Sequence, residues 1–432
     1  MRKFTLISPI ETSNRELISK VHMCYLFACR GHDAYIGDKS NIYQLPKFIN
    51  NAIYIDKGYH KNKSEKIYDS YLTGNTKIVS LDEENGVDYK SFSTLNYRFP
   101  EKVFKIFDLI FLWGEVQSDF LKGARKSFDR KKVFCYGHPK FELLKPKNNY
   151  LYKEEVLKYK DRYGRFILIN TNFGFGNNML GEGAVIEKYL SRIPNLLDII
   201  KYHKIQVNNF IDLTIALSQL NKFNIIIRPH PEEGHAIYNT AFEKYSNIHV
   251  VFSGSVIPWI IAADVTVHHD CTTSLEAAML GKSSISYTKD IDQKLTTDIP
   301  TRISYQYNNI NEVVNNINNR IYRKSYIDKE ILEKYFSFSK DSSKMILDKI
   351  INTLVVDDLP NKNMWFFKIL SNIKDLIKFI LPVKNKLFEQ KISGLNKREI
   401  NLILHKINTK HGTNVKVKRV NKYLFKFEGL SK

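Results

Sequence analysis

The sequence predicts an α/β protein with two sheet-containing domains. Its 432 residues exceed what one ordinary core holds, and its 43% hydrophobic and 13% aromatic content is enough to fill two packed cores. Short apolar runs alternate with amphipathic stretches along residues 1–150, and the same alternation returns along residues 151–355. Strands that alternate with helices form mostly parallel sheets with helices on both faces.

Residues 1–150 form the first predicted domain. A helix is expected over residues 14–30, followed by Gly31 where a helix C-cap belongs. The basic start is followed by only a short apolar run that ends at Glu11, so we expect a first strand there and not a signal peptide. No stretch approaches 18 uncharged apolar residues, which predicts a cytoplasmic protein without a transmembrane helix. The predicted strands are 3–9, 33–37, 51–56, 76–82, 108–114 and 132–137.

The second predicted domain covers residues 151–355, after a lysine-rich boundary segment at 145–164. A long helical region is expected near 185–219, a shorter helix at 272–281, and further helices along 310–355. Parallel sheets of this kind bind ligands at the carboxyl ends of their strands. The predicted strands are 165–170, 224–230, 248–252, 264–269 and 283–288.

Residues 356–432 form a basic C-terminal appendage. Residues 361–432 hold 17 Lys and Arg against 4 Asp and Glu, so this last sixth of the chain carries +13 of the net charge of +21. A basic amphipathic helix suits an anionic membrane surface, here the inner face of the cell membrane. The alternative is a helix packed on the domains. The apolar residues at helical spacing are Trp365, Phe366, Ile369, Leu370, Ile373, Leu376, Ile377 and Ile380.

The sharpest local motif ends the apolar strand at 224–228. Two prolines fix the backbone there and hold Arg228 and His230 at the mouth of the sheet, next to Pro231. A cation and an imidazole at a strand end are well placed for a phosphate. The alternative is a surface turn with an incidental histidine. The loop 169–178, which includes Asn172, follows the first strand of this domain and is a weaker nucleotide-facing candidate.

A second anion site is predicted one strand later. Thr272, Thr273 and Ser274 open a helix whose free N–H groups and dipole favour an anion, although an ordinary N-cap has the same composition. Glu276 could accept a hydrogen bond from a ribose hydroxyl. The adjacent histidines at 268 and 269 point to opposite faces of a strand, so we do not expect them to share a metal ion.

Acidic residues supply the catalytic candidates. The strand at 76–82 runs into Asp82, Glu83 and Glu84, carboxylates of the kind that act as base, acid or nucleophile. The alternative is that these acids are solvated turn residues. The Asp-x-Asp pair at 290 and 292 is of the kind that metal-dependent transferases use. It lies in a charged loop, however, and we interpret it as a solvated turn. We therefore expect neither a metal site nor a cofactor. The four cysteines lie far apart and fit reduced thiols.

An ordered series of motifs resembles the bacterial surface carbohydrate biosynthesis proteins, GT-B transferases related to retaining β-Kdo transferases and similar to CMP-sialic-acid transferases. The series comprises PIETSNRE (9–16), RGHDAYIG (30–37), LDEENG (81–86), LWGEVQSDFL (112–121), YGHPKFELL (136–144), ILINTNF (167–173), IRPHPEE (227–233), HDCTTSLEAA (269–278) and KISGLNKREI (391–400). The resemblance implies two Rossmann-like domains with a cleft between them.

The same resemblance implies roles for individual residues. A His-Pro motif and a Ser/Thr-rich helix start would hold the CMP phosphate, which assigns His230, Pro231 and residues 272–274. An acidic-acidic-Gly motif would supply the catalytic carboxylate, Glu83 or Glu84; Asn85 departs from that pattern and leaves the choice open. Glu115 is a third catalytic candidate.

The predicted function is therefore transfer of a Kdo-like or other ulosonic acid from a CMP-activated donor to a surface glycan or glycolipid acceptor, with retention of configuration. Glu11 and Arg15, at the end of the first strand, are expected to orient the acceptor or the sugar carboxylate. One alternative is a polyol-phosphate transferase that uses a CDP-glycerol-type donor. A nucleic-acid-binding protein is the alternative of another class, but the folded part is only mildly basic and has no RNP, KH or HTH pattern.

Overall fold

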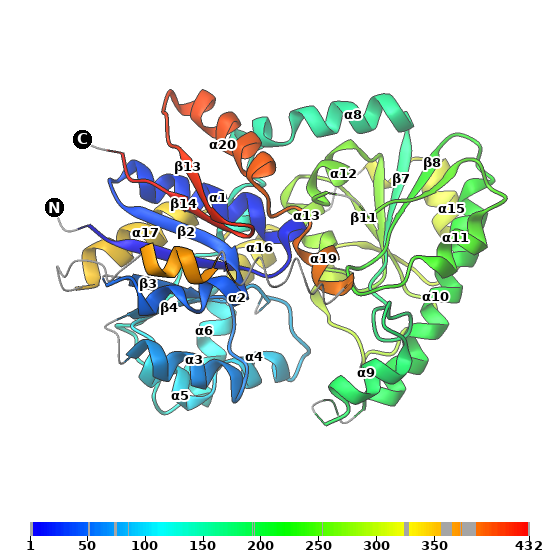
Figure 1. The fold of residues 1–432 in the computed structure, drawn as a ribbon. Coiled ribbons are helices and arrows are strands. Elements are labelled where there is room, and N and C mark those ends of the chain that lie inside the picture. Colours follow the sequence, from blue (N-terminus) through cyan, green and yellow to red (C-terminus); the bar gives the residue numbers. More distant parts are fainter. Residues whose placement is uncertain are drawn as a thin grey trace. The chain divides into compact units, whose positions relative to one another are not determined.

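The computed structural model describes residues 3–50, 52–72, 76–84, 86–191, 193, 195–252, 254–323, 328–355, 365–371, 373 and 386–430. The chain divides into two compact units (Figure 1). Unit 1 comprises Met1–Asp88, Phe92–Leu143 and Lys329–Lys432, and unit 2 comprises Tyr89–Ser91 and Leu144–Asp328. Asn85 and residues 374–381, which belong to two of the sequence motifs, lie outside the described residues.

Unit 1 is built on an eight-stranded sheet in the order β13-β14-β2-β1-β3-β4-β5-β6. Strands β1 to β6 pair in parallel, as predicted, because each returns through a helix or a loop segment on a face of the sheet. All residues of β1, β2, β3 and β5 are buried. These strands are β1 (Thr5–Ile10), β2 (Asp33–Asp38), β3 (Ala52–Asp56), β4 (Lys77–Leu81), β5 (Leu109–Leu112) and β6 (Val133–Cys135).

The long helix of unit 1 is α1 (Ser13–Cys29), which ends before Gly31 as the sequence predicts. Gly31 has φ of +85°, a left-handed conformation that glycine adopts without a Cβ clash. Unit 1 also contains α2 (Lys39–Ile42), α3 (Lys63–Leu72), α4 (Ser93–Arg98), α5 (Glu101–Ile106), α6 (Glu115–Ala124), α7 (Pro139–Glu142), α16 (Lys329–Phe336) and α17 (Ser342–Thr353).

The C-terminal residues complete the first sheet, a placement that the predicted appendage does not include. Strand β14 (Leu424–Phe427) pairs antiparallel with β2, and β13 (Val417–Asn421) pairs antiparallel with β14 (Figure 1). Helix α20 (Lys397–His411) packs on α1, after α19 (Lys386–Ile392). The physical reason is that β2 would otherwise be an edge strand with unpaired backbone groups, which β14 covers.

Helices α16 and α17 also belong to unit 1, although the predicted second domain extends to residue 355; the sequence had left open that the helices along 310–355 pack back across the domains. The backbone N–H of Ser343 in α17 donates to the buried carboxylate of Glu142 at 2.7 Å, and Arg30 forms an ion pair with Asp348 at 2.7 Å. The chain therefore crosses back at about residue 328.

Unit 2 contains a six-stranded, all-parallel sheet in the order β12-β11-β10-β7-β8-β9. Its strands are β7 (Phe166–Asn170), β8 (Asn224–Arg228), β9 (Ile248–Val250), β10 (Val265–His268), β11 (Ser284–Tyr287) and β12 (Tyr305–Tyr307). Five of them match predicted strands; the short β12 was not predicted.

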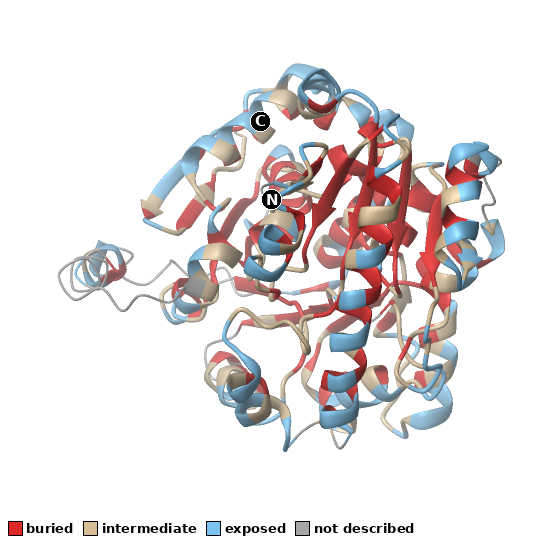
Figure 2. Cartoon of the chain, turned by 90° about the vertical axis from the view of Figure 1, so that its right-hand side faces the viewer, coloured by how far each residue is buried: buried red, intermediate tan, exposed pale blue. Residues whose placement is uncertain are grey.

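Helices cover the faces of this second sheet, with buried strands and exposed outer helix surfaces (Figure 2). The predicted helical region near 185–219 consists of two helices, α9 (Glu182–Tyr189) and α10 (Leu196–Ser218). The others are α8 (Lys153–Tyr163), α11 (Ala236–Phe242), α12 (Ile257–Ala262), α13 (Thr273–Met279), α14 (Ile299–Arg302) and α15 (Ile310–Asn318).

Candidate functional site

In each unit, polar and charged side chains gather just after the carboxyl ends of the parallel strands. In unit 1 the residues that follow β1, β3, β4 and β6 include Glu11, Lys57, Glu83 and His138. In unit 2 the loops after β7, β8 and β10 carry the predicted nucleotide-binding residues. Ligands of open α/β sheets bind at this edge, so each unit carries a candidate site where the fold predicts one.

Glu83 lies at the centre of the unit 1 site. Its carboxylate oxygens face two buried partners: Lys20 Nζ lies 2.9 Å from Oε1, and His138 Nε2 lies 3.4 Å from Oε2. Burial alone would raise the pKa of Glu83, but the charges of Lys20 and Lys140 and the nearby ring N–H of His138 hold it well below its ordinary value. Glu83 is therefore an ionised carboxylate.

Trp113 packs against the loop that carries Glu83 and fixes it. The indole Nε1 donates to the carbonyl of Asp82 at 2.7 Å, and Lys140 Nζ lies 4.2 Å from the centre of the ring. Gly86 lies against the same ring, and a Cβ at this position would come within 1.5 Å of it. This contact is the physical reason for the glycine of the acidic-acidic-Gly motif.

Glu84 has a different environment from Glu83. Its side chain is 65% exposed and lies 3.2 Å from Arg98, whose guanidinium is held by the buried carboxylate of Asp82 at 2.6 Å. Burial tends to raise the pKa of Glu84, but Arg98 and Arg15 lower it. The exposed Arg15 therefore lies near Glu84.

Glu11 lies in a second charged group beside the Glu83 cluster. Lys57 Nζ lies 2.5 Å from Glu16 and 3.5 Å from Glu11, and Lys39 forms an ion pair with Glu11. Burial would raise the pKa of Glu11, but Lys57 and Lys39 together lower it strongly. Glu11 is thus near Glu83 at the same sheet edge, as a carboxylate already paired with two lysines.

Glu115 is placed apart from these groups. It is exposed at the first position of α6, beside Gly114, against which the backbone of α16 packs. Its charge acts on Cys135 and on Lys334, which are not part of the Glu83 cluster.

In unit 2, His230 is held in one orientation. Its Nδ1 accepts from the backbone N–H of Glu232 at 3.3 Å, so the ring proton of the neutral imidazole is on Nε2. The backbone N–H of His230 donates to the buried carboxylate of Glu233 at 3.1 Å. Pro231, between them, limits the backbone further.

Glu233 connects two loops of the unit 2 site. Its Oε1 accepts from Thr171 Oγ1 at 2.8 Å and from the Phe173 N–H at 2.9 Å, in addition to His230, while its Oε2 accepts from Tyr238 at 2.7 Å. The side chain is 1% exposed, and burial raises its pKa. No sequence pattern singles out Glu233 among the acids after the His-Pro motif.

The predicted residues after β7 and β10 come together. Asn170 Nδ2 donates to Thr273 Oγ1 at 3.2 Å, and Asn172 Nδ2 donates to the carbonyl of Asp270 at 3.3 Å. The start of α13 is less open than predicted, because the buried hydroxyl of Ser274 donates to the carbonyl of Cys271 at 2.9 Å. Thr272 is exposed, and Thr273 and Glu276 are half-buried.

Arg228 makes contacts that the sequence did not predict. Its NH2 group donates to the carbonyl of Gly254 at 2.9 Å, and its guanidinium lies 5.4 Å from the centre of the Trp259 ring. Burial lowers the pKa of Arg228 to about 10. These contacts brace the loop after β9, and its role as a phosphate ligand stays a prediction.

The paired histidines serve separate networks, as the strand geometry predicts. His268 Nε2 lies 2.9 Å from Ser304 Oγ, whereas His269 contacts the carbonyl of Tyr287 at 2.8 Å and the hydroxyl of Tyr202 at 2.5 Å. In the described part of the chain, no three His, Cys, Asp or Glu residues are grouped as metal ligands. Asp290, of the Asp-x-Asp pair, accepts a hydrogen bond from the side-chain amide of Asn209 at 3.1 Å.

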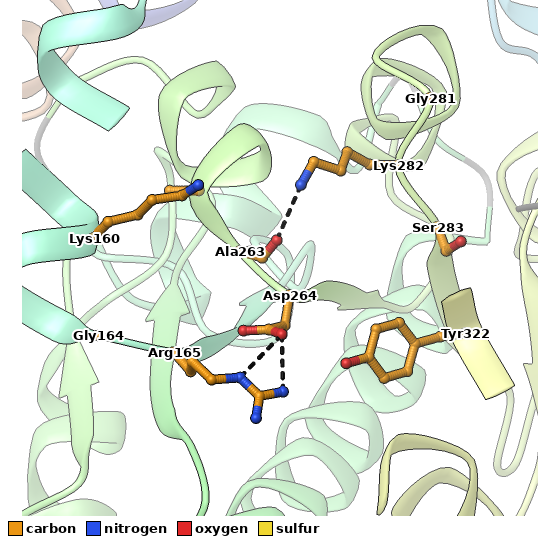
Figure 3. A pocket seen from close by; sticks show the side chains of 10 residues that line it. Lys160, Gly164, Arg165, Ala263, Asp264, Gly281, Lys282, Ser283 and Tyr322 are labelled. Atoms are coloured by element: carbon orange, nitrogen blue, oxygen red, sulfur yellow. Dashed lines mark hydrogen bonds and ion pairs between the residues drawn. The ribbon is translucent and has the colours of Figure 1, made fainter. Parts of the chain in front are cut away.

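A surface pocket of unit 2 lies at the opposite, amino-terminal edge of its sheet (Figure 3). Lys160, Arg165 and Lys282 line it, but Arg165 is paired with Asp264 at 3.0 Å and Lys282 contacts the carbonyl of Ala263 at 3.4 Å. Helices α8, α12 and α13 all end here, so the cations face the negative ends of helix dipoles.

Three residues of the unit 1 site were not predicted, although the sequence contains an indication of each. Lys20 lies at helical spacing between Leu17 and Cys24, on the apolar face of α1, where a lysine is unusual. His138 begins a His-Pro pair after a strand, the same pattern as His230 in unit 2. Lys57 follows directly after β3.

Comparison with known proteins identifies the fold. The sequence matches no protein-family model and no curated protein. The structure is similar to the wall teichoic acid polymerase TagF soaked with CDPG, at a TM-score of 0.53 and 11% identity over 81% of this chain and 88% of that one. It is also similar to the UDP-GlcNAc 2-epimerase of Methanocaldococcus jannaschii, at a TM-score of 0.50 and 11% identity over 81% of this chain and 99% of that one.

A third similar structure is the UDP-GlcNAc 2-epimerase of Neisseria meningitidis, at a TM-score of 0.50 and 11% identity over 82% of this chain and all of that one. At this level of identity the likeness concerns the fold alone. Together with the two parallel sheets described above, it shows that the chain has the predicted GT-B fold.

Proposed function

We propose that this chain is a glycosyltransferase that moves a Kdo-like or other ulosonic acid from a CMP-activated donor to a growing surface glycan or glycolipid, with retention of configuration. The observation that carries the proposal is the carboxylate of Glu83 at the carboxyl end of β4, held between Lys20 and His138.

An ionised carboxylate suits glycosyl transfer better than phosphoryl transfer. In glycosyl transfer the sugar gains positive charge in an oxocarbenium-like transition state, which a nearby carboxylate stabilises or attacks. In phosphoryl transfer the negative charge is spread over the phosphoryl oxygens, and catalysts supply cations there. The charge of Glu83 therefore favours a sugar donor.

The unit 2 site supplies groups for the donor nucleotide. His230 presents Nε2 as the protonated ring nitrogen, and Thr272 and Thr273 add hydroxyls near the side chains of Asn170 and Asn172. Neutral hydrogen-bond donors of this kind stabilise the phosphate of departing CMP without a metal ion. Glu276 remains the candidate partner of a ribose hydroxyl.

The second candidate is a polyol-phosphate transferase that uses a CDP-glycerol-type donor. Similarity to TagF, solved after a CDPG soak, favours it. The two candidates share the cytidine nucleotide and differ in the group transferred.

Binding and turnover together test the proposal. Calorimetry with CMP, CDP-glycerol and UDP-GlcNAc should show tightest binding for CMP, and His230→Ala should weaken CMP binding at least tenfold. CMP release from CMP-Kdo should fall by about two decades or more in Glu83→Gln, as expected when a catalytic carboxylate loses its charge. Glu84→Gln is the paired comparison. Turnover of CDP-glycerol but not of CMP-Kdo would establish the second candidate instead.

We also propose that the helical residues 365–371, together with Ile373, contact an anionic membrane surface. Phe367 is buried against Phe48, and this anchors the helix on unit 1. Four apolar side chains of the predicted face remain exposed beside the exposed Lys368: Trp365 at 69%, Phe366 at 47%, Leu370 at 45% and Ile373 at 48%. Apolar side chains with adjacent lysines suit the interface of an anionic bilayer. None of the described helices is long and apolar enough to cross a membrane.

A further inference from the structure

We propose that Lys20 and His138 are positioning residues that keep the Glu83 carboxylate fixed and ionised, so that Glu83 meets the sugar as an anion and takes no part in proton transfer. This inference rests on the proposed function, in which Glu83 is the catalytic carboxylate. It assigns roles to two residues for which the sequence motifs gave none.

Lys20 is committed to Glu83 by its burial. It projects from α1 with 1% of its side chain exposed, and its Nζ lies 2.9 Å from Glu83 Oε1. Among the described residues, Lys20 Nζ finds no hydrogen-bond acceptor of normal geometry. A buried ammonium is costly unless an opposite charge compensates it, so the two charges hold each other in place.

His138 contacts the other carboxylate oxygen and cannot turn freely. Its Nδ1 accepts from the backbone N–H of Lys140 at 3.1 Å, which puts the ring proton on Nε2, 3.4 Å from Glu83 Oε2. The ring is 1% exposed and packs against Trp113 at a centroid distance of 5.4 Å. Burial lowers the pKa of His138 to about 4, so the ring presents a neutral N–H to the carboxylate near pH 7.

The charged groups that face Glu83 are mainly cationic. Lys20 comes from α1, and Lys140 comes from α7 with its Nζ 4.0 Å from Glu83 Oε2. Lys57, in the loop after β3, also acts on Glu83, but it is paired with Glu16 of α1 and with Glu11. The acids of the same loop are engaged elsewhere: Asp82 and Glu84 both pair with Arg98. The local balance therefore favours the charged form of Glu83.

This arrangement decides what Glu83 can do chemically. A general acid or base works best when its pKa lies near the working pH, and the pKa of Glu83 lies far below a neutral working pH. A permanently charged carboxylate instead serves as a nucleophile or as an electrostatic partner of a cationic transition state. Proton transfer to or from the acceptor must then involve another group.

The test follows the ionisation of Glu83 directly. In full-length protein labelled with ¹³C at the glutamate carboxyl, the Glu83 signal is assigned by its loss in Glu83→Gln and titrated between pH 7 and pH 4. We expect no titration of Glu83 in the wild type over this range. In Lys20→Met the midpoint should rise by more than one pH unit, and in His138→Gln, which retains a donor, by less.

Arg30→Gln is the matched control. It removes the ion pair that α1 makes with Asp348 at its other end and should leave the Glu83 titration unchanged. A wild-type midpoint near pH 6, or a Lys20→Met midpoint equal to that of the wild type, would overturn the inference.

A double variant covers the case in which Lys20→Met does not fold. Combining Lys20→Met with Glu83→Gln removes both buried charges, so the double variant should be more stable than Lys20→Met alone. Lower stability of the double variant would also overturn the inference. CMP release from CMP-Kdo separates the two proposals, because a fully active Glu83→Gln would refute the catalytic role of Glu83 whether or not Lys20 controls its ionisation.

Discussion

Replacing Glu233 should damage the unit 2 site, although Glu233 itself is not a predicted ligand contact. Its Oε1 accepts from the backbone N–H groups of Phe173 and His230 at 2.9 and 3.1 Å, and from Thr171 Oγ1 at 2.8 Å. In Glu233→Ala the two backbone N–H groups lose their acceptor inside the protein. Each unsatisfied group costs about 1–3 kcal/mol, so we expect about 2–6 kcal/mol of lost stability.

Glu233→Gln gives the graded comparison. Its amide oxygen can still accept from the two backbone N–H groups, while its amide NH₂ faces the Tyr238 hydroxyl, which can turn to accept. Burial raises the pKa of Glu233, so ionisation already costs the folded state something that the neutral amide avoids. We expect a loss of about 1 kcal/mol.

Urea unfolding and calorimetry with CMP measure both consequences. Glu233→Ala should lower the unfolding midpoint clearly and weaken CMP binding at least tenfold, since His230 and the loop after β7 lose their common anchor. Glu233→Gln should retain most of both. Glu243→Gln, at the exposed end of α11, is the control and should match the wild type. A Glu233→Ala protein with normal stability and normal CMP affinity would refute the reasoning.

Three further predictions concern metal, pH and the membrane. In the proposed reaction His230 and the groups at the start of α13 hold the phosphate, so turnover should survive excess EDTA; loss of activity that Mg²⁺ restores would contradict this. Burial lowers the pKa of His138 and His269 to about 4 and that of His268 to about 3, so below pH 6.5 the unfolded chain takes up protons that the folded protein does not. The free energy of unfolding should therefore fall from pH 6.5 towards pH 4. Each histidine contributes at most about 1.4 kcal/mol for each unit by which its folded pKa lies below its unfolded pKa. An equal thermal midpoint at pH 7 and pH 5 would argue against this. Binding to vesicles rich in phosphatidylglycerol should weaken in Trp365→Ser and at high salt; salt-insensitive binding, or no binding by the wild type, would favour a helix that only packs on unit 1.

The sequence was sufficient for the fold class and for most strands. Apolar runs of four to seven residues between helical stretches are a local pattern, and the parallel sheets follow from that alternation. The end of α1 before Gly31 was also predictable, because a helix C-cap depends on one residue and its backbone conformation. The position of His230 after β8 follows in the same way from a strand that ends in a His-Pro pair.

Tertiary structure alone decided which distant residues meet. Nothing local in residues 417–427 shows that β14 pairs with β2, since any exposed edge strand could accept it. Likewise, the acidic loop does not reveal that Lys20, some sixty residues earlier, lies 2.9 Å from Glu83, or that the neighbouring Glu84 stays exposed. A carboxylate's pKa depends on the charges and burial around it in space, and these are set by packing between segments rather than by sequence spacing.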